Sequence, residues 1–149
     1  MDNKFVLAFL AIFSNVIGQV FLKGGLGYKV DGVQTIPKWA KILGAKPLEI
    51  SFQGGGGLSQ VVAFITNFPA LLGALMGLVF FVFWVALVSK AGLGFANGMM
   101  ALFFVIICVV SRFLFGEYFG GLKLVGVILI MFGFLFVAIG EQYGLPIQK

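Results

Sequence analysis

The stretch LLGALMGLVFFVFWVALV, residues 71–88, contains no charged side chain. As a helix it would be about 27 Å long at ~1.5 Å per residue, which is close to the ~30 Å hydrocarbon core of a bilayer. Its apolar side chains occupy every face of that helix, which is typical of a segment with no side exposed to water. The stretch therefore predicts a transmembrane helix.

Three further stretches have the same character. The predicted spans are 5–22, 71–88, 95–115 and 122–140. The last three spans are joined by connections so short that consecutive helices must be antiparallel neighbours. The sequence thus predicts an all-α membrane protein in which residues 1–149 form a single domain of four antiparallel transmembrane helices.

The composition supports this class and excludes others. Of 149 residues, 61% are hydrophobic and 10% charged, and the mean hydropathy is +1.14. A soluble domain could not cover so much apolar surface with so few charges. The chain has no histidine and one cysteine, Cys108, so we expect no disulfide framework, metal or cofactor. No carboxylate lies inside an apolar span, and without a nucleophile–base pair we do not expect an enzyme.

The net charge of +5 comes from residues that flank the spans. This placement indicates membrane orientation and contact with anionic lipids rather than binding to nucleic acid. The side with the first and third connections holds seven positive residues: Lys23, Lys29, Lys38, Lys41, Lys46, Arg112 and Lys123. The other side holds Lys4, Lys90 and Lys149. The positive-inside rule then predicts that both termini lie outside the cytoplasm.

The connection 23–68 is the longest polar segment. Glycines within 24–27 are expected to end the first helix. Further on, Pro37 suits a first helical turn. One face of that turn would carry Ile36, Trp39, Ala40 and Leu43. Two interpretations stay open, namely a short helix in the headgroup layer anchored by Trp39 and a solvated loop.

A second short helix is predicted after the flexible joint Gly54–Gly57. Apolar residues recur there at helical spacing: Leu58, Val61, Val62, Ile65 and Phe68. Ser59 could cap the start of this helix, and Pro69 would bend the chain into the next span. The helix is too short to cross a bilayer, so we expect it at the membrane surface.

Small residues mark predicted helix–helix contacts. Gly73 and Gly77 form a GxxxG pair in the second span, and Gly126, Gly133 and Gly140 repeat every seven residues in the fourth. Such positions permit close backbone packing in lipid. The contact made by the fourth span could lie inside one subunit or between two.

Several stretches together resemble a known group. They are SNVIGQVFLK at 14–23, WVALVSKAGL at 84–93, ANGMMAL at 96–102, FGE at 115–117 and GVILIMFG at 126–133. Their order and spacing resemble the four-helix members of the drug/metabolite transporter superfamily, which include small multidrug resistance transporters and EamA-like flippase subunits. The resemblance covers 5–23 and 69–140. It implies a multi-pass protein of the cell inner membrane. Because four short helices enclose too little volume for a large lipid headgroup, we also expect a dimer of identical or sister chains, with the glycine face of the fourth span at or next to the contact.

Two departures shape the functional expectation. Small multidrug transporters exchange protons through a glutamate in the first helix, and the matching position here is Asn15, which cannot titrate. The ending Gly18-Gln19-x-x-x-Lys23 instead resembles subunits assigned to flipping aminoarabinose linked to undecaprenyl phosphate. The connection 23–68 is longer than in those families, and its role is not carried over.

The candidate substrate-binding residues are Asn15, Gln19, Lys23, Trp84, Asn97, Ser111 and Arg112. The first three share one helix face, whereas Asn97 begins the third span and Arg112 lies near its other end. Polar residues in apolar spans are costly and often functional, although amides can also simply join helices and cations can snorkel. We expect a transporter or flippase subunit for a polyprenyl-phosphate-linked sugar or similar anionic lipid. Its partners would then be membrane lipids and the lipid-linked substrate.

Two alternatives stay open. One is efflux of an amphipathic or cationic compound, against which the lack of a membrane carboxylate counts. The other is a non-transporting accessory membrane protein, for which the long connection would be a docking surface.

Overall fold

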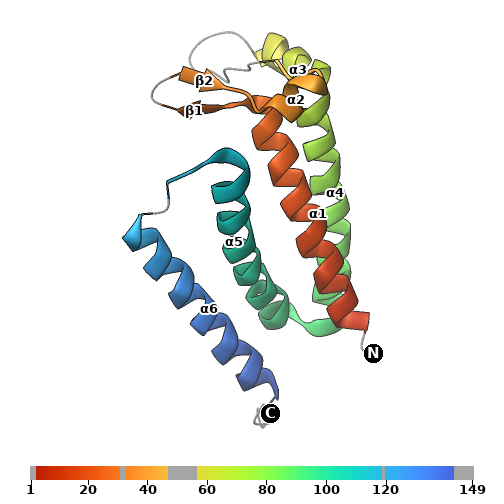
Figure 1. Ribbon diagram of the computed structural model, residues 1–149. Coiled ribbons are helices and arrows are strands. Elements are labelled where there is room, and N and C mark those ends of the chain that lie inside the picture. The colour runs from red at the N-terminus through yellow and green to blue at the C-terminus, as the bar shows by residue number, and fades with distance from the viewer. Residues whose placement is uncertain (1–2, 31–32, 47–56, 119, 143–149) are drawn as a thin grey trace. The chain divides into compact units, whose positions relative to one another are not determined.

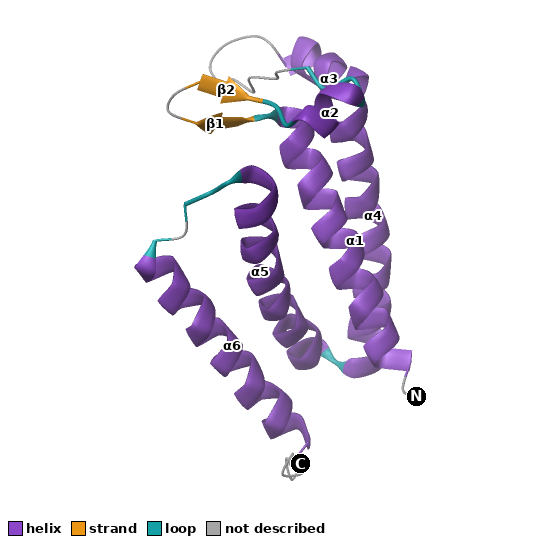
Figure 2. Cartoon of the chain, in the orientation of Figure 1, coloured by secondary structure: helices purple, strands orange, loops and turns teal. Residues whose placement is uncertain are grey.

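The computed structural model describes residues 3–30, 33–46, 57–118 and 120–142 (Figure 1). Its elements are α1 (Asn3–Leu26), β1 (Tyr28–Val30), β2 (Val33–Thr35), α2 (Lys38–Ile42), α3 (Gly57–Thr66), α4 (Phe68–Ala91), α5 (Leu93–Phe115) and α6 (Gly121–Gln142). Helix dominates, with one small hairpin between α1 and α2 (Figure 2).

Four helices in the described part of the chain are long and apolar enough to cross a membrane: α1, α4, α5 and, over Gly121–Gly140, α6. The predicted all-α membrane fold is therefore confirmed. Every helix reaches beyond its predicted span, because glycine and polar residues at the ends lower the local hydropathy without stopping the helix. The four helices are distributed over two compact units, 14–79 and 1–13 with 80–149, and α1 and α4 each contribute to both.

In the unit 14–79, glycines bring α1 and α4 into backbone contact. A Cβ placed on Gly73 would lie 2.6 Å from the Leu22 nitrogen and 2.7 Å from the Gly18 oxygen. Four residues further along α4, the Gly77 nitrogen lies 3.4 Å from the Cβ position of Gly18. Gly73 has no room for a side chain at this crossing, whereas Gly77 contributes its backbone and has space for a Cβ. The GxxxG pair therefore packs against α1 within the same chain.

The same contacts give the direction of the helices. Gly18 of α1 lies against Gly73 and Gly77, whereas Gly25, nearer the end of α1, lies against Ala70 near the start of α4. Positions that rise along α1 meet positions that fall along α4. The two helices therefore run antiparallel.

The glycine-rich end of α1 differs from the prediction. We expected residues 24–27 to break the helix, but α1 continues through Gly24 and Gly25 and ends at Leu26. A Cβ on Gly24 would overlap the ring of Trp39, and one on Gly25 would lie 2.5 Å from the Ala70 nitrogen. These two glycines therefore allow the end of α1 to pack closely against Trp39 and Ala70. The helix stops at Gly27, where φ is +78°, a conformation that favours glycine.

The chain folds back over the end of α1. Strands β1 and β2 pair antiparallel, with Tyr28 opposite Thr35. The amide of Gln34 in β2 donates to the Leu26 carbonyl at 3.2 Å, which satisfies one of the carbonyls left open at the helix end.

Helix α2 lies where one of the two interpretations predicts a short helix. Pro37 precedes the helix as its N-cap, and the predicted apolar face is turned onto the chain itself, with Ile36 at 7% and Ala40 at 0% exposure. The Trp39 ring packs edge-on against Phe21 of α1, with centroids 5.6 Å apart. Trp39 thus anchors α2 to α1, because the ring fills the space that Gly24 leaves. The helix excludes the solvated loop, and its place in the headgroup layer stays a prediction.

Helix α3 confirms the second short helix, whose location at the membrane surface stays a prediction. It begins at Gly57, so Ser59 lies inside it and is not its N-cap. Asn67 separates α3 from α4 and is only 2% exposed. Its Oδ1 accepts from the Ala70 N–H at 3.4 Å, as an N-cap of α4 does. Its Nδ2 donates to the Gly25 carbonyl at 2.8 Å and to the Lys46 carbonyl at 3.0 Å. One side chain therefore joins the end of α1, the start of α4 and the connection between them.

Replacing Asn67 with alanine is expected to lower the free energy of unfolding by roughly 2 kcal/mol, since a helix cap is lost and buried carbonyls lose their donor. Asn67→Asp keeps the capping oxygen but removes both Nδ2 hydrogen bonds and should be no better than alanine. Thermal unfolding in detergent measures both variants. Thr66→Ala, which removes only an exposed local hydrogen bond, is the control. Unfolding of Asn67→Asp at the parental temperature would contradict the bridging role of Nδ2.

In the other unit, the start of α1 packs against α4 and α5. The core comprises Ala8, Leu87, Phe95 and Ala96. Phe95 also meets Phe5 edge-on with ring centroids 5.8 Å apart, and the ammonium of Lys4 lies over both rings.

Helices α5 and α6 form an antiparallel pair in the same unit. The Cβ position of Gly98, early in α5, lies 3.3 Å from Val137, late in α6. In Figure 1 the two helices diverge from this end toward the connection that joins them. The glycine repeat does not form this contact, since Cβ atoms built on Gly126, Gly133 and Gly140 would meet nothing within 4 Å among the described residues. Its face is open to another chain.

Candidate functional site

Three of the polar side chains of α1 lie along one face. Positions four apart are rotated by about 40°, so Asn15, Gln19 and Lys23 form a narrow stripe over two turns. Asn15 is 8% exposed, and its neighbour Ser14 is 5% exposed. Gln19 is exposed and Lys23 half-buried. All four belong to the unit 14–79.

Asn15 is a buried amide near the middle of α1. It is the thirteenth of 24 residues in α1, and thus near the middle of the hydrocarbon layer if the helix crosses it. Its amide makes no side-chain hydrogen bond to the rest of the described chain. Because no polar side-chain atom of a non-exposed described residue is both fully enclosed and unpaired, the Asn15 amide is buried but not completely enclosed by the described chain. An amide open to hydrocarbon would cost several kcal/mol, which indicates a polar occupant or water.

The stripe ends at Lys23, where α1 meets the hairpin. The Lys23 ammonium lies over the Tyr28 ring, 6.0 Å from its centroid. The Lys23 carbonyl accepts from the Gly27 N–H at 3.0 Å, the bond that closes the helix. The face of the Tyr28 ring thus holds the Lys23 cation at the edge of the span. Tyr28 was not among the predicted site residues, because its place beside Lys23 follows from the turn at Gly27.

The remaining candidates lie in the other unit. Trp84 is half-buried, with its ring 6.3 Å from that of Phe81 in a tilted arrangement. Asn97 is exposed near the start of α5, and Arg112 is exposed near its end. Fifteen residues of helix separate these two by about 22 Å at ~1.5 Å per residue, so α5 does not bring them into one site.

Arg112 has a local structural role. Its Nη1 donates to the Glu117 carbonyl at 3.1 Å, just past Gly116, which ends α5 with φ at +65°. Ser111 beside it is half-buried. Arg112 therefore fastens the turn after α5, as cations near helix C-termini commonly do, and still exposes part of its guanidinium.

A groove of about 320 Å³ lies beside the contact of α5 with α6. It is lined by Leu102, Ile128, Met131, Phe132, Phe134 and Leu135. With this apolar lining it suits hydrocarbon and not a polar headgroup. Among the described residues, no three His, Cys, Asp or Glu side chains are grouped as metal ligands would be. The stripe of α1 is therefore the candidate site for a polar group.

No family model, curated protein or solved structure matches the chain.

Proposed function

We propose that this protein is a subunit of a membrane transporter that moves an anionic lipid, with a polyprenyl-phosphate-linked sugar as the substrate class. The observation that carries the proposal is the polar stripe of α1, in which the amide of Asn15 is buried but not completely enclosed, within an otherwise apolar helix. Such a surface is unfavourable against lipid tails and favourable against a sugar or phosphate.

The order of the stripe fits a lipid headgroup that enters from the membrane surface. Lys23 lies at the end of the span and provides a positive charge for a phosphate, while the amides of Gln19 and Asn15 lie successively deeper. Amides both donate and accept hydrogen bonds, as sugar hydroxyls require. The lipid tail would stay in the bilayer, where the apolar surfaces of the other helices suit it.

The resemblance to the drug/metabolite transporter superfamily supports the same class. In that comparison Asn15 stands where small multidrug transporters carry their proton-exchanging glutamate. An asparagine has no proton to exchange, so the stripe is better suited to binding a headgroup than to coupling drug export to a proton gradient. The inner membrane and the dimeric state belong to this proposal as well.

Reconstitution into liposomes tests the function. A fluorescent undecaprenyl-phosphate sugar incorporated into both leaflets should become accessible to a membrane-impermeant quencher faster with the protein than without it. Movement of phosphatidylcholine analogues in the same vesicles is the control for leakage and nonspecific scrambling. Drug-dependent proton flux without lipid movement would favour the multidrug alternative and overturn the proposal.

The open glycine face of α6 predicts a dimer contact. Gly133→Leu adds bulk to a face that is exposed in this chain, so folding of the monomer should be preserved while close approach of a second helix is blocked. Cross-linking in membranes should therefore show a much lower dimer fraction. Leu124→Phe, at an exposed position on the opposite side of the same helix, is the control. An undiminished Gly133→Leu dimer would place the contact elsewhere.

A further inference from the structure

The segment between α1 and α4 lies at the membrane boundary. We refer to its described residues, 27–30, 33–46 and 57–67, as the cap. Hydrogen bonds fasten the cap to the last turn of α1, from Gln34 to the Leu26 carbonyl and from Asn67 to the Gly25 carbonyl. Because α1 is about 36 Å long at ~1.5 Å per residue, its end reaches the edge of a ~30 Å hydrocarbon core. The cap is therefore held at headgroup depth.

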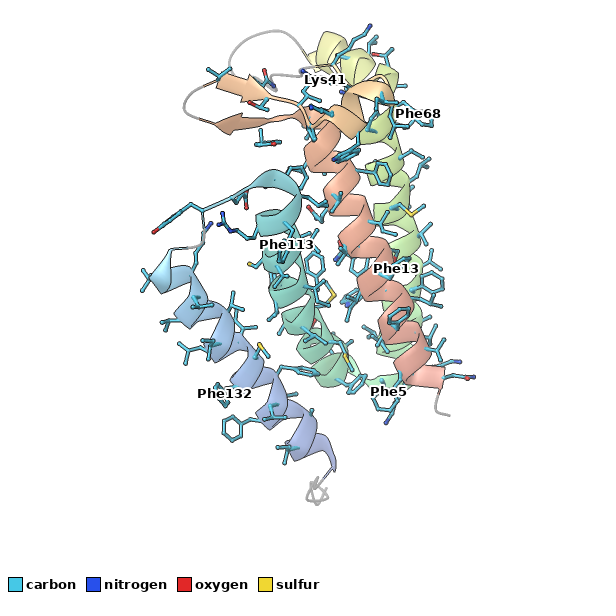
Figure 3. All side chains as sticks on the ribbon, viewed as in Figure 1. Phe5, Phe13, Lys41, Phe68, Phe113 and Phe132 are labelled. Atoms are coloured by element: carbon cyan, nitrogen blue, oxygen red, sulfur yellow. The ribbon has the colours of Figure 1, made fainter. Side chains whose placement is uncertain are left out.

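One surface of the cap is apolar and uncovered. In α3, Val61, Val62 and Ile65 fall within an arc of about 100°, and each is between 54% and 58% exposed. The helix carries no charged residue. Phe68, which begins α4, extends the apolar surface at 51% exposure. Figure 3 labels Phe68 and Lys41 near this end of α1 and α4.

The cap also exposes cations. Lys38 and Lys41 of α2 are exposed, and Ile42 next to them is 84% exposed. Lys46 is also exposed, and its backbone carbonyl is held by Asn67, the residue that caps α4. The chain between 27 and 67 contains four lysines and two acidic residues, and the two acidic residues lie outside the described part.

We propose that the cap is a lipid-binding surface that inserts the apolar face of α3 into the headgroup region and binds anionic phospholipids through Lys38, Lys41 and Lys46. The exposed apolar side chains would contact lipid acyl chains, and the lysines would contact lipid phosphates. This surface holds lipid whether or not the protein transports one. It also gives the long connection a role, since a bare turn between α1 and α4 would present neither feature.

Lipid retention tests the electrostatic part. The full-length protein is reconstituted in nanodiscs with equal parts of phosphatidylglycerol and phosphatidylcholine, extracted in mild detergent, and its bound lipids counted by native mass spectrometry. The double variant Lys38→Gln/Lys41→Gln should lose phosphatidylglycerol enrichment by roughly five-fold for each lysine removed. Lys90→Gln, an exposed lysine at the other end of α4, is the matched control. Parental enrichment in the double variant, or an equal loss in Lys90→Gln, would overturn the proposal.

Insertion is measured separately with a nitroxide at Val62→Cys in a Cys108→Ser background. Accessibility to oxygen well above accessibility to a water-soluble nickel complex is the expected result. The reverse order would show that α3 faces water. Protection from both reagents would show that protein covers α3, as expected of a docking surface for a second subunit. Either of these results would overturn insertion.

Discussion

Gly73→Ala is expected to lower the free energy of unfolding by roughly 3 kcal/mol, the upper part of the range for overpacked sites. The added Cβ would lie 2.6 Å from the Leu22 nitrogen and 2.7 Å from the Gly18 oxygen, closer than real Cβ atoms approach other heavy atoms. Both are backbone atoms of α1, so a rotamer change cannot relieve the overlap. The helices would have to separate, and separation weakens the packing along the whole interface. Unfolding in detergent by heat or by increasing dodecyl sulfate measures the change.

Gly77→Ala is the matched control, one turn further along the same helix. A Cβ there meets nothing within 4 Å, and alanine is the better helix former by about 1 kcal/mol. This variant should therefore be as stable as the parent or slightly more stable. If alanine destabilises the protein at position 73 but not at position 77, the cause of the destabilisation is helix packing and not helix propensity. Equal destabilisation of both variants would contradict the crossing at Gly73.

The four spans could be predicted because their physical cause is local. A run such as residues 71–88, apolar on every side, has few stable environments other than a bilayer. The helix ends could not be predicted in the same way. Glycine is a helix breaker in water, yet Gly24 and Gly25 remain helical because Trp39 and Ala70 occupy the space that side chains would take. The partners that decide this lie 15 and 45 residues away.

The cap shows the same limit. The helical pattern of α3 was visible in its apolar spacing, but the bridging role of Asn67 depends on carbonyls of α1 and of Lys46. The sequence does contain an N-cap signal for α4, the asparagine directly before Phe68-Pro69. Using this signal would have moved the predicted start of the second span from residue 71 to residue 68. The hydrogen bonds of its Nδ2 had no counterpart in the local sequence.

The sequence predicted which residues of the candidate site share a helix face, but it could not predict how buried each of them is. Four-residue spacing placed Asn15, Gln19 and Lys23 on one face whatever the rest of the fold. It did not reveal that Asn15 is buried while Gln19 is exposed, since exposure depends on what packs beside α1. For α5, helix length alone keeps Asn97 and Arg112 apart.

Lys23→Gln is expected to reduce lipid binding and transport by about ten-fold or more, the loss that corresponds to one charge-assisted hydrogen bond to a phosphate. The change removes the positive charge at the end of the polar stripe and keeps a side chain that can still hydrogen-bond. Stability should fall by no more than about 1–2 kcal/mol, the contribution of a half-buried cation–π contact such as that with Tyr28. Initial rates in the liposome assay and binding of the lipid-linked sugar are the measurements, with thermal unfolding and cross-linking as checks on fold and assembly.

Two further variants test whether Lys23 binds the substrate through its charge or only anchors α1 at the membrane boundary. Lys23→Arg retains the charge with a planar head and should keep part of the activity, whereas a purely interfacial anchor would tolerate arginine without loss. Lys90→Gln removes a cation at the other end of the spans and should leave the rate unchanged. A Lys23→Gln protein that transports at the parental rate would make Lys23 an anchor at the membrane boundary. In that case the polar stripe would contain no phosphate-binding charge, and helix packing alone would explain the amides of Asn15 and Gln19.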